Sequence, residues 1–217
     1  MKKNIVLFSL FILPIVAYLF FASGVHNFTH LPTVTKSIPD LNNWKNKYGE
    51  QFSLNDKITV LVFPGTEILY NKGDAFNLNQ KIYEKVMGFK DFQLICIAPI
   101  GTEEQTIELK EELGRISDMS KWNYVFASPE EIKTYYDKLN LIAQLDENLR
   151  TPNVFIIDKE RNLRGRKGKN KKGEPEYKEG YNSISAADLH NEMGDDIKII
   201  LAEYRLALKK NSAERKK

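Results

Sequence analysis

The sequence predicts one α/β domain with a mixed central β-sheet flanked by helices, preceded by one N-terminal transmembrane helix. Two observations carry this prediction. Short runs of buried-strand type alternate with amphipathic helical stretches along most of the chain, and an apolar run without charges stands near the N-terminus. The composition agrees, because 42% of the 217 residues are hydrophobic and 28% are charged, which excludes a disordered or low-complexity chain.

The apolar run extends from Ile5 to Phe21, directly after Lys2 and Lys3. A helix of this length is just long enough to cross a bilayer, and the lysine pair favours an N-terminus in the cytoplasm. We therefore expect residues 1–24 to be a single-pass anchor in the inner membrane, with the domain facing the periplasm.

The alternative for this segment is a signal peptide that is removed after export. Ala22, Ser23 and Gly24 are small residues of the kind that signal peptidase recognises. In that case the protein is secreted to the periplasm. Both interpretations export the rest of the chain.

Residues 25–40 are expected to form a tether, because they contain Pro32 and Pro39 and show no strong periodicity. His26 and His30 lie in this tether at a spacing of four residues, which places two imidazoles on one face of a helix. A metal carrier that uses this pair is therefore one alternative function, although prolines disfavour the helix that it needs.

Four runs of strand-forming residues predict the strands of the sheet. Residues 58–63 and 92–98 are almost continuously apolar, which is typical of strands covered on both faces. Shorter strands are expected at 124–126 and 154–157. The polar turn at 158–162 predicts that the chain returns near Leu163 as a hairpin partner.

The helices are predicted from apolar spacing and from their start signals. Leu78, Ile82 and Val86 recur at steps of four and predict a helix over 74–87. The segments 102–105 and 128–131 read as capping boxes, each followed by a helix. Ser185 is expected to cap a long final helix, so that the domain covers 41–209 and a basic tail covers 210–217. The apolar face of this helix consists of Leu189, Met193, Ile197, Ile200, Leu201, Tyr204 and Leu208.

This order of elements is that of the thioredoxin fold, and three segments resemble the Sco/SenC family over about residues 40–165. The segments are 48–54, which resembles a strand pair before the first core strand, 122–132 and 155–165. Sco/SenC proteins are membrane-anchored copper chaperones and thiol reductants of cytochrome oxidase assembly. The resemblance implies a thioredoxin-like domain whose partner is an envelope or respiratory-complex protein.

The same resemblance implies where the copper ligands of the family would lie. Family members place Cys-x-x-x-Cys after the first core strand and a histidine ahead of the late strand, a set that suits copper. These positions fall on Thr66, Tyr70 and Arg150. We therefore expect no metal, no cofactor and no catalytic residue here, and a binding or assembly module without copper or dithiol redox activity. Whether the loop at 64–73 has acquired a new activity stays open. Pro152 resembles the cis-proline of thioredoxins.

Cys96 carries the alternative from another functional class, a thiol or peroxide oxidoreductase. It is the only cysteine of the chain and alternates with Ile95 and Ile97 along a predicted strand. A cysteine in such a place is usually a small buried apolar residue with an inert thiol.

A cluster of seven cations within twelve residues is the main charged feature of the sequence. It predicts a docking loop for acidic partners or anionic headgroups, against the simpler interpretation of a solvated loop. Nucleic acid is not expected as a partner, because the net charge is only +3 and no aromatic stacking platform is interleaved. The cations are Arg161, Arg164, Arg166, Lys167, Lys169, Lys171 and Lys172.

Overall fold

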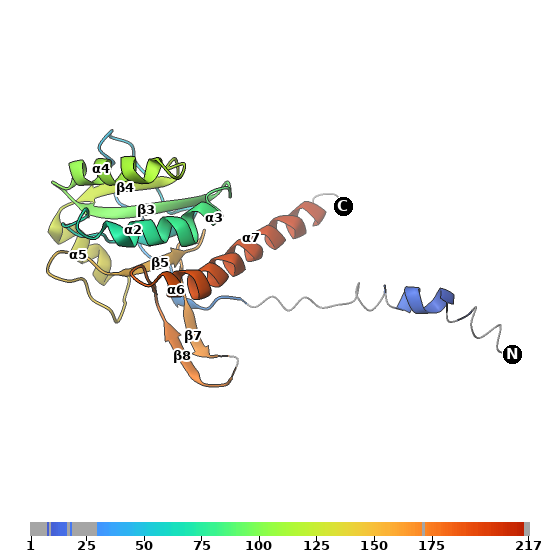
Figure 1. The fold of residues 1–217 in the computed structure, drawn as a ribbon. Coiled ribbons are helices and arrows are strands. Elements are labelled where there is room, and N and C mark those ends of the chain that lie inside the picture. Colours follow the sequence, from blue (N-terminus) through green and yellow to red (C-terminus); the bar gives the residue numbers. More distant parts are fainter. Residues whose placement is uncertain (1–7, 9, 17, 19–29, 171, 215–217) are drawn as a thin grey trace.

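A central mixed sheet organises the chain in the computed structural model, which describes residues 8, 10–16, 18, 30–170 and 172–214. Figure 1 shows this sheet between layers of helices. The strands, in their order across the sheet, are β1 (Thr33–Thr35), β6 (Leu163–Arg164), β5 (Asn153–Ile157), β2 (Ile58–Val62), β3 (Phe92–Pro99) and β4 (Trp122–Ala127).

The three strands β2, β3 and β4 are parallel, whereas β5 pairs antiparallel with β2. Strand β6 returns antiparallel to β5 as predicted, and β1 closes that edge. The predicted strands at 58–63, 92–98, 124–126 and 154–157 are confirmed. Further strands follow late in the chain: β9 (Tyr181–Asn182) pairs with β5, and β7 (Arg166–Lys169) forms a separate hairpin with β8 (Pro175–Lys178).

Strand β3 explains why the molecule has two apolar cores. All eight of its residues are buried, and successive side chains of a strand point to opposite faces of the sheet. Leu94 and Cys96 belong to one core, whereas Ile95 and Ile97 belong to the other. A strand buried on both faces requires helices on both sides of the sheet.

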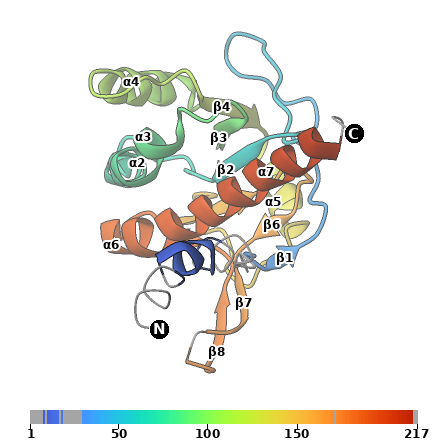
Figure 2. The ribbon, with the colours of Figure 1, turned by 90° about the vertical axis from the view of Figure 1, so that its right-hand side faces the viewer.

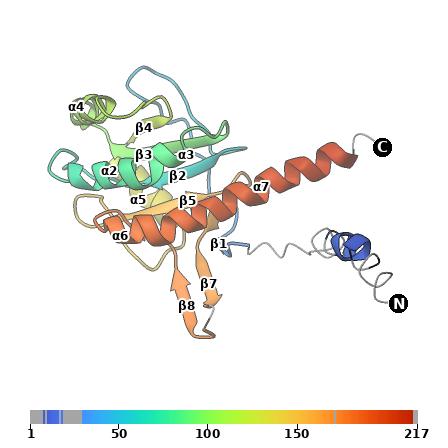
Figure 3. The ribbon, with the colours of Figure 1, turned by 45° about the vertical axis from the view of Figure 1, so that its right-hand side comes forward.

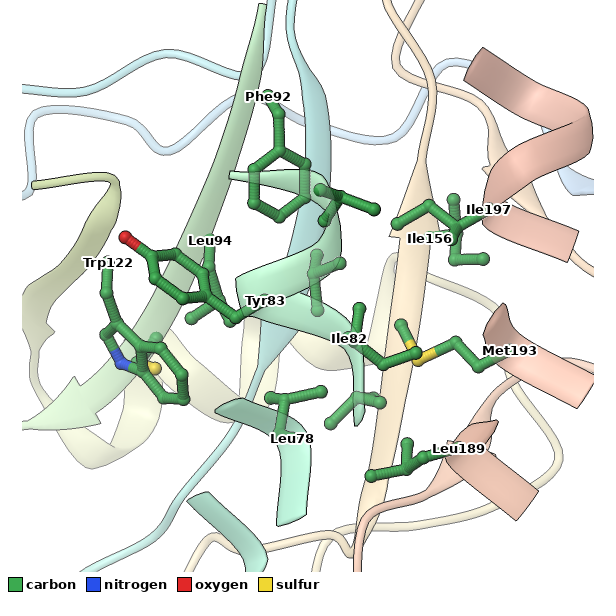
Figure 4. Packing of buried hydrophobic residues seen from close by; sticks show 14 of the residues in the cluster. Leu78, Ile82, Tyr83, Phe92, Leu94, Trp122, Ile156, Leu189, Met193 and Ile197 are labelled. Carbon is green, nitrogen blue, oxygen red and sulfur yellow. The ribbon is translucent and has the colours of Figure 1, made fainter. Parts of the chain in front are cut away.

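The first core is covered by three helical stretches. Figure 2 shows them on one side of the sheet, with helix α5 (Pro129–Asp137) on the other. The first stretch contains π-helical turn η1 and the last contains η2, and the two turns contact each other. Figure 4 shows Ile82 of η1 and Met193 of η2 in this core. The stretches are α2 (Lys72–Leu78), η1 (Asn79–Tyr83) and α3 (Glu84–Val86); α4 (Glu103–Gly114); and α6 (Ala186–Asp188), η2 (Leu189–Met193) and α7 (Gly194–Glu214).

The second core is covered by α5 (Pro129–Asp137) and by the segment that precedes β2. Helix α5 begins as predicted, with Ser128 accepting a hydrogen bond from the Glu131 amide and Glu131 accepting one from the Ser128 amide. Trp44 from the preceding segment packs edge-on against Tyr135 of this helix.

The predicted capping box at Thr102 is wrong. The Thr102 hydroxyl donates to the Pro99 carbonyl at 2.7 Å, and Glu103 accepts a hydrogen bond from the Gly101 amide instead. The reason is local: Thr102 has φ −102° and ψ 8°, not the extended conformation that turns a cap side chain toward the helix amides.

The closing helix docks on the sheet as predicted, with Leu189, Met193, Ile197, Ile200 and Leu201 buried. Ser185 accepts a hydrogen bond from the Asp188 amide at its start. Helix α7 continues to Glu214, beyond the point where the sequence predicts a tail. Figure 3 shows its C-terminal part projecting past the sheet.

The edge strand β4 is bonded along its outer side. The Phe126 amide donates to the Lys45 carbonyl at 3.1 Å, and the Lys110 amine donates to the Trp122 carbonyl at 2.7 Å. Lys45 belongs to the segment before β2, and Lys110 belongs to α4. Two other parts of the chain therefore bond to the outer side of β4.

The predicted N-terminal anchor lies mostly outside the described residues. Its residues 10–16 are helical, and apolar side chains such as Phe11, Leu13 and Ile15 are exposed. Among the residues that the structure describes, no helix is long and apolar enough to cross a membrane.

Candidate functional site

The loop that follows β2 is where the family resemblance places the copper ligands. Pro64 forms an antiparallel bridge with Arg150, and the Thr151 amide donates to the Phe63 carbonyl at 3.2 Å. Gly65 makes this approach possible, because a Cβ there would lie 2.6 Å from the Asn148 carbonyl oxygen. The fold thus brings the loop after β2 against the segment before β5.

Thr66 is held by hydrogen bonds from two directions. Its amide donates to the Asn148 carbonyl at 2.9 Å, and its own carbonyl accepts from Gln105 Nε2 of α4 at 2.9 Å. The Thr66 hydroxyl lies 3.4 Å from Asn148 Oδ1, and the side-chain nitrogen of Asn148, Nδ2, lies 3.4 Å from Glu67 Oε2. The loop is therefore polar and tied down at its base.

Arg150 forms an ion pair with Asp74 in the first turn of α2. Both side chains are mostly buried, with exposures of 16% and 24%. A guanidinium offers only donors and stays protonated at physiological pH, so it serves neither as a metal ligand nor as a base. Asp74 was missed in the sequence, where an acidic residue at a helix start is an ordinary stabilising feature.

Tyr70 does not join this arrangement, because its side chain is 87% exposed. Of the three predicted positions, the structure brings Thr66 and Arg150 to adjoining segments and leaves Tyr70 at the surface. Hydroxyls and a paired guanidinium hold a loop in place, but they do not supply the thiolate and imidazole donors that copper prefers.

A small cavity of about 40 Å³ lies beneath this loop. Buried Cys96, Trp122 and Tyr124 line it together with the partly exposed Asp74 and Arg150. Trp122 Nε1 is buried without a hydrogen-bond partner. The volume suits a few water molecules at most, so it does not hold a substrate of ordinary size.

Cys96 is buried on β3 with an exposure of 1%. Burial raises the pKa of its thiol to about 12, because the charged thiolate is poorly solvated inside the core. Because the thiolate is the reactive form, this environment keeps the sulfur unreactive near neutral pH. The geometry therefore disfavours an oxidoreductase that uses Cys96.

Cys96 is expected to resist maleimide in the folded protein at about pH 8. With a pKa of about 12, roughly one thiol in ten thousand is ionised there, and the sulfur is also covered. Mass spectrometry should find unmodified native protein and complete labelling in denaturant. Fast, complete labelling of the native protein would restore the oxidoreductase interpretation.

The predicted cis bond before Pro152 is wrong, because the described residues contain no cis peptide. The chain bends at Pro152, between the bridge at Arg150 and the start of β5. The Pro152 carbonyl accepts hydrogen bonds from both the amide and the hydroxyl of Ser183, at 2.8 Å and 2.7 Å. The segment is thus fixed by pairing on both sides.

Two members of the predicted docking loop are structural residues. Arg164 is buried, with ion pairs of 3.0 Å to both Asp158 and Glu203. Arg166 pairs with Asp196 at 2.7 Å and with Glu176 at 3.2 Å. Two of these four carboxylates, Glu203 and Asp196, come from α7, and local sequence does not reveal such pairs. Both arginines are therefore removed from the docking prediction.

The other cations of that loop have different surroundings. Lys167, Lys169 and Lys172 are exposed on the β7–β8 hairpin and its turn, whereas Arg161 is half-buried and Lys171 lies outside the described residues. His26 also lies outside them. His30 is exposed, 3.3 Å from Glu203, and the described part of the chain holds no cluster of three metal-ligating side chains.

Comparisons with known proteins give matches only among solved structures. No protein family and no curated protein matches the sequence. A SCO1/SenC family lipoprotein from Bacillus anthracis is similar with a TM-score of 0.56 and 16% identity, over 80% of this chain and 99% of that chain. BsSco, a member of the Sco family of cytochrome c oxidase assembly proteins, is similar with a TM-score of 0.52 and 14% identity, over 78% of this chain and 94% of that chain. The domain has a Sco-like thioredoxin fold.

The Sco-like fold confirms the predicted resemblance, but the segment before the first core strand departs from the prediction. Residues 48–54 do not form a strand pair. Lys45 and Gln51 form one antiparallel bridge around a turn in which Gly49 has φ +83°. Asn46 closes this turn by accepting hydrogen bonds from the Tyr48 and Glu50 amides at 2.9 Å.

Proposed function

We propose that the chain is a membrane-anchored, Sco-like protein of the bacterial envelope that acts by binding another protein, without copper or dithiol chemistry. The Sco-like fold supports the assignment of class. The ion pair between Arg150 and Asp74 carries the proposal, because it stands where the family resemblance places a metal ligand.

The membrane part of the proposal rests on the lysine pair and the apolar run that follows it. The exposed apolar side chains of residues 10–16 support it, since a stripe of this kind is stable in lipid and not in water. The domain then faces the periplasm. The mass of the mature protein distinguishes an anchor from a cleaved signal peptide.

The loop after β2 is the surface that we assign to partner binding. It exposes Tyr70 beside Glu67, on a base fixed by Thr66. Exposed tyrosines on a rigid loop are common anchors of protein interfaces, because they bury a large area with little loss of conformational freedom. We propose a protein of respiratory oxidase maturation as the partner, in line with the family to which BsSco belongs.

Copper retention gives a direct test of the first half of the proposal. The full chain in detergent, loaded with Cu(I) and desalted, is expected to retain less than about a tenth of an equivalent, because a hydroxyl, a phenol and a guanidinium replace soft donors. Replacing Thr66→Cys, Tyr70→Cys and Arg150→His together should raise retention to about one equivalent. Stoichiometric copper on the unmodified chain would contradict the proposal.

Complementation tests the second half. In a host strain that lacks this protein, assembled oxidase activity is expected to be restored fully by the Cys96→Ala variant and to fall at least about fivefold with Tyr70→Glu, which places a charge in the interface. Tyr48→Glu is the matched control, because Tyr48 is a similarly exposed tyrosine away from the loop. Loss of activity with Cys96→Ala, or full activity with Tyr70→Glu, would overturn the proposal.

A further inference from the structure

A groove of about 310 Å³ runs between the helical stretch η1–α3 and α7. Its floor is apolar and is continuous with the first core. Phe89, at the end of the first stretch, is 44% exposed at this groove. The apolar lining consists of Ile82, Val86, Phe89, Ile197, Leu201 and Ala202.

Cations surround this apolar floor. Lys81 and Lys85 line the groove from the first stretch, and Lys198 and Arg205 line it from α7. Two carboxylates lie near: Asp195 pairs with Lys198 at 2.9 Å, and Glu84 accepts a hydrogen bond from the Ser117 hydroxyl. Lys85 also contacts His190 at 3.1 Å. Cations remain in excess, so the groove suits an anionic, amphiphilic surface.

The sequence holds further cations after Arg205. Lys209 and Lys210 are helical positions, and Figure 3 shows this part of the helix projecting past the sheet. From Arg205 to the end of the chain the sequence holds six cations and a single carboxylate, Glu214. Its last part, residues 210–217, is the predicted basic tail, and the proposed function leaves these cations without a role.

The start of the folded domain is fastened to the same helix. The Leu31 amide donates to Glu203 at 3.0 Å, and Arg164 donates to the Leu31 carbonyl at 2.9 Å through Nε. Glu203 lies two positions before Arg205. Leu31 lies seven positions after the expected end of the anchor at residue 24, so the two are at most about 25 Å apart along the chain. The tether therefore holds α7 close to the bilayer.

We infer that the groove and the C-terminal part of α7 form a second membrane contact, which lies against anionic lipid headgroups. The inference rests on the proposed membrane anchor and adds to it an orientation of the domain. Basic segments beside an anchor are attracted to anionic bilayers, and an adjoining apolar surface strengthens the contact. The short tether favours lipid over an acidic protein as the occupant.

A fluorescent reporter at Gly88 tests this contact in the full chain. A Cβ there meets no atom within 4 Å, so we expect Gly88→Cys to be tolerated, and buried Cys96 is not expected to react. The chain, labelled with a polarity-sensitive dye, is reconstituted in vesicles of phosphatidylcholine with or without phosphatidylglycerol. We expect a blue shift only with phosphatidylglycerol, reversed by high salt.

Two charge-reversal variants separate this surface from general electrostatic attraction. Replacing Lys81, Lys85 and Lys198 by glutamate should raise the phosphatidylglycerol fraction needed for half the shift by about tenfold or abolish the shift. The matched control reverses three exposed lysines of the β7–β8 hairpin, Lys167, Lys169 and Lys172, and should leave the shift unchanged.

The outcomes distinguish the contact from the anchor. Flotation of the vesicles in a density gradient shows whether the chain is anchored. If the chain floats with both kinds of vesicle but the dye does not respond to phosphatidylglycerol, the second contact is overturned and the anchor stands. The same holds if the two charge-reversal variants give equal dye shifts. If the chain floats with neither, the anchor fails and the inference fails with it. A shift that needs an added acidic protein instead of lipid overturns the lipid assignment.

Discussion

Replacing Arg164 by alanine is expected to lower the free energy of unfolding by about 3–5 kcal/mol. The guanidinium satisfies three partners at once: the Asp158 carboxylate, the Glu203 carboxylate and the Leu31 carbonyl. Asp158 is 1% exposed, so removal of its cation leaves a buried charge without compensation. The same change removes the guanidinium that links the Leu31 carbonyl to Glu203 of α7.

Urea denaturation of the full chain in detergent measures this effect. Lys167→Ala is the matched control, because it removes a cation three positions away that is exposed, and it should change stability by less than about 0.5 kcal/mol. An Arg164→Ala variant with the stability of the control would show that the network does not hold the closing helix.

Replacing Gly65 by alanine is expected to cost about 3 kcal/mol in the free energy of unfolding. Gly65 has φ +75°, which disfavours any side chain. The new Cβ would also lie 2.6 Å from the Asn148 carbonyl oxygen and 2.7 Å from Arg150 Cβ. The loop after β2 would therefore separate from the segment before β5.

Gly73→Ala provides a control with the opposite sign. Gly73 lies in α2, and a Cβ there meets no atom within 4 Å. Alanine should raise stability by about 0.5–1 kcal/mol, because it restricts the unfolded chain and favours the helix. Thermal melts of both variants test this prediction: the melting temperature should fall for Gly65→Ala and rise for Gly73→Ala. Equal shifts of the two melting temperatures would contradict the packing described at Gly65.

The sheet and its helices could be predicted from the sequence, because their signals are local. The continuous apolar run of β3 requires burial on both faces, and the box at Ser128 places the start of α5. The closing helix is equally explicit, since Leu189, Met193 and Ile197 follow its period. At Thr102 the same local signal failed, because the backbone conformation turned the hydroxyl away.

The candidate site and the basic loop were predicted less well, because long-range partners decide them. Arg164 and Glu203 are 39 residues apart, and Arg166 and Asp196 are 30 residues apart. Without the tertiary fold, such arginines cannot be told from the exposed Lys167 beside them. Asp74 meets Arg150 across 76 residues, so the ion pair at the site was equally hidden.

The bonding along the outer side of β4 bears on how the molecule avoids aggregation through its sheet. An open strand edge recruits strands from neighbouring molecules, and molecules confined to a surface collide often. Here the carbonyl of Lys45 and the amine of Lys110 engage that edge, while the opposite edge is the three-residue strand β1. Sheet-to-sheet aggregation through either edge of the sheet is thereby opposed.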